Sequence, residues 1–436
     1  MDTLIANATI VTMNDRMDVL FGAYLGIEDG KISYIGKEAP PLPPGTVIDG
    51  TGMVLLPGLI NCHTHLAASI LRNFCDELSP SEALETQLQR EDKMDSKCAR
   101  AAATVAVAEC LRFGVTSVSD LYYYPAATAE VIAESGMKAN LALSAYRFID
   151  ASEEFDFETD EQCAELRRVA EKWNGYDGGR IRIDCGIFAE YTSNYKLWEG
   201  LVGYAAEQGL GFQLHLSESE QERDGCIERT GLAPAELLGC HGVWNVPAAA
   251  AGGGALTAEE MRLLGKKRAS LVYCPISALK RALPEPDVPS CAKAGINVAL
   301  GTDGCVESGS LDLWEAIRAA ALSSRRSGTL LPASAVLMMA TLCGARAQGR
   351  SAECGMLKPG MDADLVAVDF SAPHLIPCHN VLDGLVYCAK GGDVALTMVR
   401  GKILYRSGSF PTLNLAEAVN TLTSYAIPRV FTEPKA

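Results

Sequence analysis

Leu56-Pro57-Gly58-Leu59-Ile60-Asn61-Cys62-His63-Thr64-His65 is the stretch that decides how this chain can be organised. It is an apolar run, typical of a buried strand, and it ends in a His-x-His pair. Side chains two residues apart on a strand point to the same side, so His63 and His65 aim together from the strand end. Two converging imidazoles suit a transition metal, although histidines at a strand end can also simply pack. Further ligands at other strand ends would decide between these interpretations.

The composition describes a large acidic chain with enough apolar residues for a sizeable core. Of 436 residues, 48% are hydrophobic and 21% are charged, and the formal net charge is -16. A chain this acidic is not expected to bind nucleic acid or anionic membranes. We expect no signal peptide and no membrane span, because the basic and long apolar segments that these require are missing. With fifteen cysteines and no Cys-x-x-Cys pair, the chain is expected to carry free thiols in the cytoplasm.

Apolar, β-rich runs alternate with helical patterns through the middle of the chain. Helical periodicity is clear over residues 97–113, 160–173 and 195–208. The strand-like runs are Gly58–Cys62, Val115–Ser119, Ala139–Ala145, Ile181–Phe188, Gly211–Leu216, Leu271–Cys274 and Ile296–Leu300. The spacing demands an eighth strand between residues 243 and 256, where an alanine- and glycine-rich sequence has poor strand propensity. Eight strands, each followed by a helix, predict an α/β fold of the (β/α)8, or TIM-barrel, class.

Both ends of the chain carry short β-patterned segments. Near the N-terminus a hairpin turn is expected at Glu28-Asp29-Gly30, and near the C-terminus Ala363–Asp369 is strand-like. Neither end has enough strands for a stable sheet of its own. We therefore expect one small β-sandwich domain formed by both chain ends, residues 1–56 and 355–436, the second part including a tail. The barrel is expected over residues 57–354.

Further polar residues fall where strands of the predicted barrel end. His215 and Glu218 lie at the end of the fifth strand, and Asp303 follows the eighth. Active sites of such barrels lie at the C-terminal strand ends, so these residues are expected to meet His63 and His65. Alone, His215 could be a core histidine and Asp303 a helix N-cap. Together, three histidines and one aspartate form a donor set for one divalent metal, zinc or else iron.

The same set indicates hydrolytic chemistry. A divalent metal lowers the pKa of a water ligand to about 7, Asp303 can accept its proton, and Glu218 can carry a proton between water and substrate. The substrate then needs an electrophilic carbon: an amidine-like C–NH2, an amide or imide, or a chlorinated heteroaromatic carbon. The expected partner is therefore a small molecule that loses ammonia, an amine or chloride.

Motifs along nearly the whole chain resemble those of the amidohydrolase superfamily. They are Leu56–His65, His215–Glu218, Gly301–Gly304, Gly344–Ala347 and Gly355–Asp369. The pattern is most similar to the branch that holds S-adenosylhomocysteine/methylthioadenosine deaminases, guanine deaminase and triazine hydrolases. The resemblance implies a metal-dependent enzyme that acts on carbon–nitrogen bonds other than peptide bonds. A homodimer is expected on this resemblance alone.

The resemblance also implies roles for individual residues. It assigns His63, His65, His215 and Asp303 as metal ligands and Glu218 as the proton shuttle. The strand-four lysine that bridges two metals in other branches has no counterpart near residues 181–188. One metal is therefore implied.

Three pocket histidines of this branch are absent. Their positions hold Phe188 after the fourth strand, Gly252 at the sixth and Tyr273 at the seventh. Tyr273 is a candidate replacement because its phenol can donate a hydrogen bond, unless it is only a packed aromatic. Other candidate substrate-binding residues are Phe188 itself, Tyr122, which can stack on a flat ring, and Arg147, which can meet an anionic group. Packing of Tyr122 and solvation of Arg147 are the competing interpretations.

These observations leave three functions open. The first is a hydrolytic deaminase of a nitrogen heterocycle, such as a purine, a nucleoside or a related ring. The second keeps the metal and Glu218 but releases another group, by triazine dechlorination or by hydrolysis of a cyclic amide or imidazolone. The third is a degenerate member that binds metal without turnover. The remaining histidines, His241, His374 and His379, are expected to lie outside the site.

Overall fold

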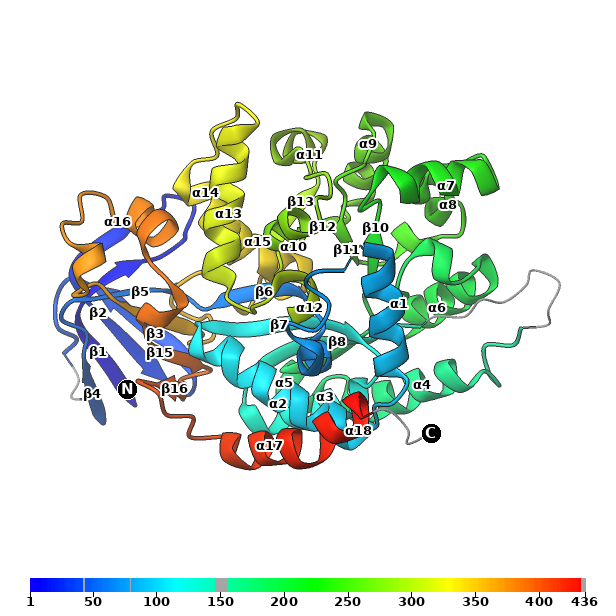
Figure 1. Ribbon diagram of the computed structural model, residues 1–436. Helices are drawn as coiled ribbons and strands as arrows, with labels where there is room; N and C mark the ends of the chain where they lie inside the picture. The colour runs from blue at the N-terminus through cyan, green and yellow to red at the C-terminus, as the bar shows by residue number, and fades with distance from the viewer. Residues whose placement is uncertain (42–43, 79, 146–154, 433–436) are drawn as a thin grey trace.

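Eight parallel strands form the central barrel of the molecule (Figure 1). The computed structural model describes residues 1–436 except 42–43, 79, 146–154 and 433–436. The strands follow one another around the ring in chain order: β6 (Leu59–Thr64), β7 (Val115–Tyr122), β8 (Lys138–Leu143), β9 (Ile181–Gly186), β10 (Phe212–Leu216), β11 (Ala248–Gly252), β12 (Ser270–Tyr273) and β13 (Asn297–Leu300). The predicted (β/α)8 barrel and its seven strand-like runs are confirmed.

The strand that the spacing demanded is β11, in the alanine-rich stretch. It pairs in parallel with β10 along its whole length and with β12 over three residues. Alanine has little preference for β structure, so pairing on both sides decides the conformation of this segment. The strand ends at Gly252, whose φ of +103° favours glycine.

The ring closes between β13 and β6 through residues beyond the regular pairing. The backbone N–H of Asp303 donates to the carbonyl oxygen of His63 over 3.0 Å. The Asn61 amide donates to Thr302 Oγ1 at 2.7 Å and accepts the Thr302 N–H at 3.0 Å. This closure holds Asp303 next to the His-x-His pair.

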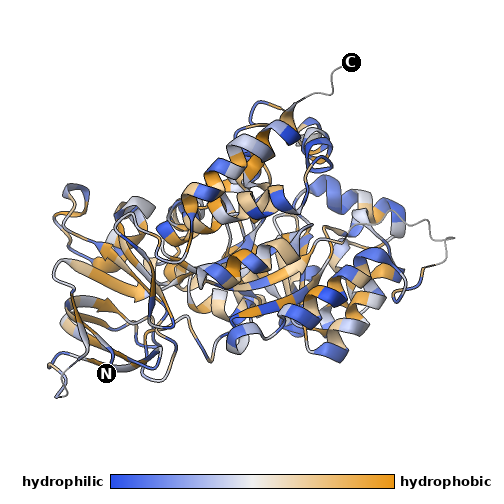
Figure 2. Ribbon diagram, turned by 90° about the horizontal axis from the view of Figure 1, so that it is seen from below, coloured by the Kyte–Doolittle hydropathy of each residue, from blue (hydrophilic) through white to orange (hydrophobic). Residues whose placement is uncertain are grey.

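Helices cover the outside of the barrel, and Figure 2 shows hydrophobic residues on the strands and hydrophilic ones on outer helix faces. Strands covered in this way are expected to be buried on both faces, and nearly all residues of these strands are buried, polar ones included. The helices expected over residues 97–113, 160–173 and 195–208 are α2, α4 and α6. The helices are α1 (Pro80–Glu91), α2 (Ser96–Arg112), α3 (Pro125–Ser135), α4 (Glu161–Trp173), α5 (Tyr176–Gly179), α6 (Tyr195–Gln208), α7 (Glu220–Thr230), α8 (Pro234–Cys240), α9 (Ala258–Lys267), α10 (Pro275–Lys280), α11 (Val288–Ala294), α12 (Cys305–Ser308), α13 (Leu313–Arg326), α14 (Ala333–Met339) and α15 (Leu342–Ala347), with a 3-10 turn, η1 (Leu66–Leu71), after β6.

The two chain ends share a second sheet, in which N-terminal strands (blue) and C-terminal strands (orange) lie side by side in Figure 1. Its strand order is β16-β15-β14-β5-β1-β2-β3, and β4 pairs with β1. The predicted small β domain from both chain ends is confirmed. Its strands are β1 (Thr3–Val11), β2 (Val19–Glu28), β3 (Lys31–Gly36), β4 (Thr46–Asp49), β5 (Met53–Pro57), β14 (Leu365–Asp369), β15 (Val394–Val399) and β16 (Lys402–Arg406).

Strand β14 alternates between two cores. Leu365 and Ala367 belong to the core of the small sheet, whereas Val366 and Val368 belong to the large core that includes the barrel helices. This alternation has the two-residue period of a strand, and it means that one face of the small sheet packs against the barrel.

Past α16 (Val381–Asp383), the tail forms α17 (Leu415–Thr421) and α18 (Ile427–Phe431), which pack on α2 and α1 of the barrel. None of the described helices is both long and apolar enough to cross a membrane.

Candidate metal centre and active-site pocket

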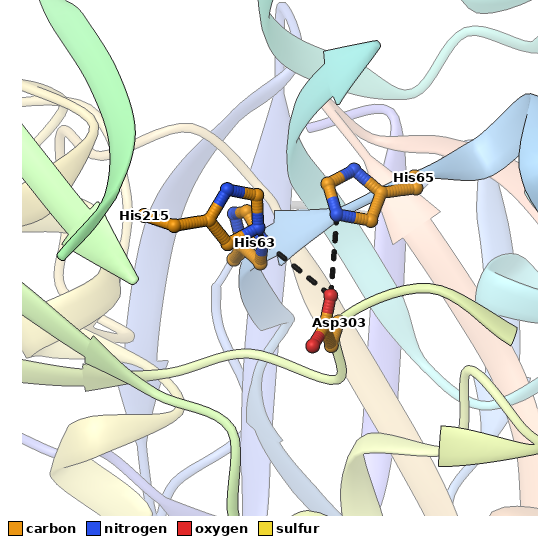
Figure 3. A group of neighbouring side chains, drawn as sticks. All are labelled: His63, His65, His215 and Asp303. Atoms are coloured by element: carbon orange, nitrogen blue, oxygen red, sulfur yellow. Dashed lines mark hydrogen bonds and ion pairs between the residues drawn. The ribbon is translucent and has the colours of Figure 1, made fainter. Parts of the chain in front are cut away.

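Four buried side chains meet at the C-terminal mouth of the barrel (Figure 3). His63 and His65 come from β6, His215 from β10, and Asp303 from the segment just after β13. Their potential ligand atoms all lie within 4.8 Å of one another. Nε2 of His63 is 3.0 Å from Nε2 of His215, and Nε2 of His65 is 3.2 Å from Oδ1 of Asp303. The structure thus brings together the four residues that the sequence singled out.

The outer nitrogens of two of the histidines are bound to the backbone. Nδ1 of His65 donates to the carbonyl oxygen of Leu121 at 2.7 Å, and Nδ1 of His215 donates to that of Phe188 at 2.8 Å. A carbonyl can only accept, so each Nδ1 carries a hydrogen, and Nε2 is the ring atom that is left to bind a metal. This is the tautomer that a metal-binding histidine needs.

Asp303 is oriented by several groups at once. Ser277 Oγ donates to Oδ2 at 2.7 Å, and the N–H of Gly304 donates to Oδ1 at 2.9 Å. The backbone of Asp303 has a φ of +65°, in the left-handed region that non-glycine residues rarely adopt. Such a conformation is kept only where the surroundings impose it, and here it aims the carboxylate at the histidines.

Asp120 plays a similar part for His65. Its Oδ1 accepts the Thr64 hydroxyl at 3.1 Å and the Leu66 N–H at 2.7 Å, on either side of His65. Burial raises the pKa of Asp120 to about 6. The carboxylate therefore fixes the backbone where β6 gives way to η1.

The charges in the cluster favour a cation. Burial lowers the pKa of His63 to about 3 and also lowers that of His215, which favours the neutral imidazoles that a metal needs. Burial alone would lower the pKa of His65, but the hydrogen bond to Asp303 and its charge raise it to about 10. A proton shared by His65 and Asp303 competes with a metal for the same two atoms. Three imidazole nitrogens and one carboxylate fit a single divalent metal.

A cavity of about 350 Å³ opens over the cluster. It is lined by His65, His215 and Asp303 at its floor and by acidic, aromatic and aliphatic side chains on its walls. The wall residues that carry chemistry are Asp76, Glu91, Tyr122, Phe188, Tyr191, Glu218, Lys280, Arg281 and Glu307. The predicted proton shuttle Glu218 is therefore at the wall of the same cavity as the metal ligands.

Glu218 lies between a cation and a glycine. Nη1 of Arg281 donates to its Oε2 at 3.2 Å. A Cβ added at Gly252 would lie 2.7 Å from Cγ of Glu218, so the glutamate occupies space next to the end of β11 that a side chain there would need. Glu218 thus occupies the space beside Gly252, the position at which the resemblance led us to expect a histidine.

Glu222 holds the backbone that carries Glu218. Its two carboxylate oxygens accept the N–H groups of Ser217 and Glu218, each at 2.8 Å. Ser217 has a φ of +46°, so this turn is strained and the carboxylate fixes it. Burial and the charge of Glu218 raise the pKa of Glu222 to about 7.

Two of the other predicted substrate-binding residues line the cavity. Phe188 lines the cavity with its ring 4.5 Å from that of His215. Tyr122 lines it too, and its hydroxyl donates to Oε1 of Glu91 at 2.6 Å. Arg147 lies outside the described residues.

Tyr273 does not line the metal cavity in the described structure. Its hydroxyl donates to Oε2 of Glu285 at 2.5 Å, away from the metal ligands, where Ser323 bonds to the same oxygen. Its role as a replacement for a pocket histidine therefore gains no support from this geometry. His241 and His374 pair with Glu199 and Asp393 and do not line the cavity.

The sequence analysis missed Glu91, Ser277, Arg281 and Glu307. Burial raises the pKa of Glu91, and burial together with the charge of Asp303 raises that of Glu307 to about 7. These side chains follow no short motif: Glu91 ends α1, Arg281 follows α10 and Glu307 lies in α12, whereas Ser277 of α10 reaches Asp303.

Comparison with known proteins now places the chain. The model of the amidohydrolase family matches residues 54–404, which include all four ligands and Glu218. The chain belongs to the amidohydrolase family. The resemblance noted in the sequence is thereby confirmed.

This amidohydrolase is similar to curated deaminases over nearly its whole length. A 5-methylthioadenosine/S-adenosylhomocysteine deaminase of Moorella thermoacetica is 35% identical over 428 residues, 96% of this chain and 98% of that protein. A 5'-deoxyadenosine deaminase of Methanosarcina mazei is 36% identical over 408 residues, covering 92% of each. The solved structure of an adenosine deaminase from Xanthomonas campestris with bound zinc superposes with a TM-score of 0.92 at 27% identity, covering 99% of each chain.

These findings fix the class of enzyme. An amidohydrolase with deaminase relatives and a complete set of metal ligands is a metal-dependent hydrolase that acts on carbon–nitrogen bonds other than peptide bonds. Its cluster of three histidines and one aspartate is a site for a single divalent ion, and its substrate is a small molecule.

Proposed function

We propose that this amidohydrolase is a zinc-dependent deaminase of an amino-substituted purine or purine nucleoside. The observation that carries the proposal is the buried cluster of His63, His65, His215 and Asp303, with Glu218 on the wall of the cavity above it. The deaminase relatives support the leaving group, and the zinc-bound structural neighbour supports zinc over iron.

The chain supplies proton transfer at two places. A bound divalent metal lowers the pKa of a water ligand to about 7. Asp303 is placed to accept a proton there through a carboxylate that Ser277 orients. Glu218 can carry a proton to a ring nitrogen or to the departing amino group, as a positioned carboxylate does. In balance, water adds to the ring carbon, the C–N bond breaks, and ammonia leaves with the transferred protons.

The cavity walls suit a flat ring with attached hydroxyl groups. Phe188 and Tyr191 present aromatic surface at the wall, on which a heterocycle can stack. Glu91 is a buried carboxylate at another part of the wall, already bonded to Tyr122 and Gln87. Its remaining acceptor capacity can bind hydroxyl groups of a sugar.

Further properties complete the proposal. The enzyme acts in the cytoplasm as a homodimer and does not bind nucleic acid. The acidic net charge of -16 supports the last of these. The homodimer is supported by resemblance alone.

Ammonia release over a panel of rings tests the proposed function. The zinc-loaded protein would be incubated with aminopurines, their nucleosides, pterins, cytosine and aminotriazines, and with chlorinated triazines and cyclic amides as alternative substrates. We expect ammonia from at least one aminopurine or its nucleoside. Chloride release or ring opening without ammonia would contradict a deaminase in favour of another hydrolase. No product from any compound, with metal confirmed in the protein, would favour a non-catalytic member.

A further inference from the structure

Glu307 is a half-buried residue at the wall of the metal cavity, in α12 just after Asp303. Within the described part of the chain, its buried Oε2 has no hydrogen-bond partner. A Cβ added at Gly304 would collide with this oxygen and lie close to the ring of His65. The glycine thus makes room for a carboxyl group beside the metal ligands.

Other acidic groups of the cavity have partners. Asp76 pairs with Lys280 at 2.6 Å, and Glu218 pairs with Arg281 at 3.2 Å. Glu91 accepts the hydroxyl of Tyr122, and Asp303 accepts that of Ser277. A buried polar atom without a partner costs free energy comparable to a lost hydrogen bond, so its presence at a cavity wall calls for a ligand.

Glu307 and Glu218 lie on different sides of the cluster. Glu218 follows β10 and packs against Gly252 at the end of β11. Glu307 follows β13 and lies against Gly304 and His65, where the barrel closes on β6. A ring whose reacting carbon faces the metal ligands therefore turns one edge to Glu218 and another to Glu307.

The chemistry of a 6-aminopurine identifies these edges. The carbon that bears the amino group has ring nitrogen N1 on one side and, through C5, ring nitrogen N7 on the other. If Glu218 transfers a proton at N1, the N7 edge faces Glu307. The last torsion of a glutamate is soft, so either oxygen can turn toward this edge.

We infer that Glu307 determines specificity by accepting a hydrogen bond from a ring N–H on the side of the reacting carbon opposite to Glu218. The inference rests on the proposed function and refines its substrate class. It selects purine-like rings with a hydrogen on N7, as an oxo group at carbon 8 provides, over rings that present a bare nitrogen or a C–H there.

Binding of three unreactive rings tests this inference. The probes are the ribonucleosides of 6-methylpurine, its 8-oxo form and its 7-deaza form, which present N, N–H and C–H at the tested edge and carry no leaving group. Dissociation constants would be measured by calorimetry on the zinc-loaded protein. We expect the 8-oxo ring to bind about ten-fold more tightly than the 7-deaza ring, which is the size of one hydrogen bond.

Variants separate the contact from the bulk of the oxo group. Glu307→Met removes the acceptor, so the ratio of the two dissociation constants should fall to what the size of the oxo group alone produces. Glu307→Gln keeps an acceptor and should retain part of the preference for the 8-oxo ring. The exposed Glu228→Gln on α7 makes the same chemical change outside the cavity and should leave the ratio unchanged. Thermal unfolding would show that each variant is folded.

Two results would overturn the inference: a ratio that is the same in the wild type and in Glu307→Met, or no binding of any of the rings. Ammonia release is measured separately. A ratio that depends on Glu307 in a protein that releases no ammonia would reject the proposed deaminase while leaving this contact in place.

Discussion

Ser277 contacts the metal ligand Asp303, and the orientation of that ligand depends on this contact. Its hydroxyl donates to Oδ2 of Asp303 at 2.7 Å inside the buried cluster. Replacing Ser277 with alanine leaves the carboxylate without this donor, and loss of such a supporting contact typically lowers metal affinity 10- to 100-fold. Competition of the Ser277→Ala variant and the wild type for zinc against a chelator would measure this. Equal affinities would show that Gly304 and the backbone of Asp303 are sufficient.

Glu218 should matter for turnover and not for metal binding, because it lies on the cavity wall and outside the ligand cluster. Glu218→Gln keeps the shape of the side chain but removes its ability to carry a proton. We expect the rate of ammonia release to fall by about 10²- to 10⁴-fold with unchanged zinc content. Retained activity in this variant would move the proton transfer to another group, such as Glu307.

At this scale the sequence predicted the ligands but not their surroundings. His63, His65, His215 and Asp303 follow directly from their places at strand ends of a barrel. Arg281 and Glu307 come from the short helices after β12 and β13, whose path the strand pattern does not determine. Nothing in the sequence predicts that Glu218 would pack against Gly252. Tyr273 shows the converse, because its strand position was predicted but its hydroxyl turns toward Glu285.

Among the elements, β11 connects the fold to the chemistry. Gly252 ends the strand with a φ of +103°, and a Cβ there would lie 2.7 Å from Glu218 Cγ and 3.0 Å from the carbonyl oxygen of Leu216. Gly252→Ala should therefore destabilise the protein by about 1–2 kcal/mol through backbone strain and displace Glu218. Chemical unfolding and the rate of ammonia release would both be measured. Gly203→Ala, where a Cβ meets no atom within 4 Å on α6, is the matched control.

The same strand shows where propensity fails. Ala248–Gly252 has a poor strand sequence, and only the count of barrel strands predicted it. Tertiary pairing with β10 and β12 overrides the local preference. The order of strands in the barrel could be predicted for the same reason, since parallel strands joined by helices follow one another around the ring.

The whole molecule is joined at a buried cluster of charges between the barrel and the small sheet. Lys138 of β8 is fully buried, and its Nζ lies 2.7 Å from Asp362 and 2.6 Å from Asp364, beside β14. Lys138→Met would remove the buried cation next to Asp364 and would leave Asp362 with Lys31 and Arg400 alone, at a cost of about 3–5 kcal/mol in the free energy of unfolding. Arg100→Met, at an exposed ion pair with Glu134, should cost less than about 1 kcal/mol. Equal effects would show that the junction is solvated.

The junction also predicts a dependence of stability on pH. Burial opposes the charge of Asp362, but Lys138, Lys31 and Arg400 lower its pKa from an ordinary 3.8 to about 2. A carboxyl group whose pKa is lower in the folded state stabilises the protein above its unfolded pKa and loses this contribution as the pH falls through the folded value. The melting temperature should thus fall between about pH 4 and pH 2. Asp362→Asn should be less stable at pH 5 and show a flatter profile, and an equally steep profile would contradict the assignment.

The central claim is a single-metal hydrolytic deaminase, and one titration tests it most directly. Zinc would be added in steps to metal-free protein while ammonia release from an aminopurine nucleoside is measured. We predict no release without metal and a linear rise that saturates at one zinc per chain, the number that the cluster of three histidines and one aspartate can hold. Activity without metal, a requirement for a second ion, or one bound zinc with no ammonia from any ring in the panel would contradict the claim.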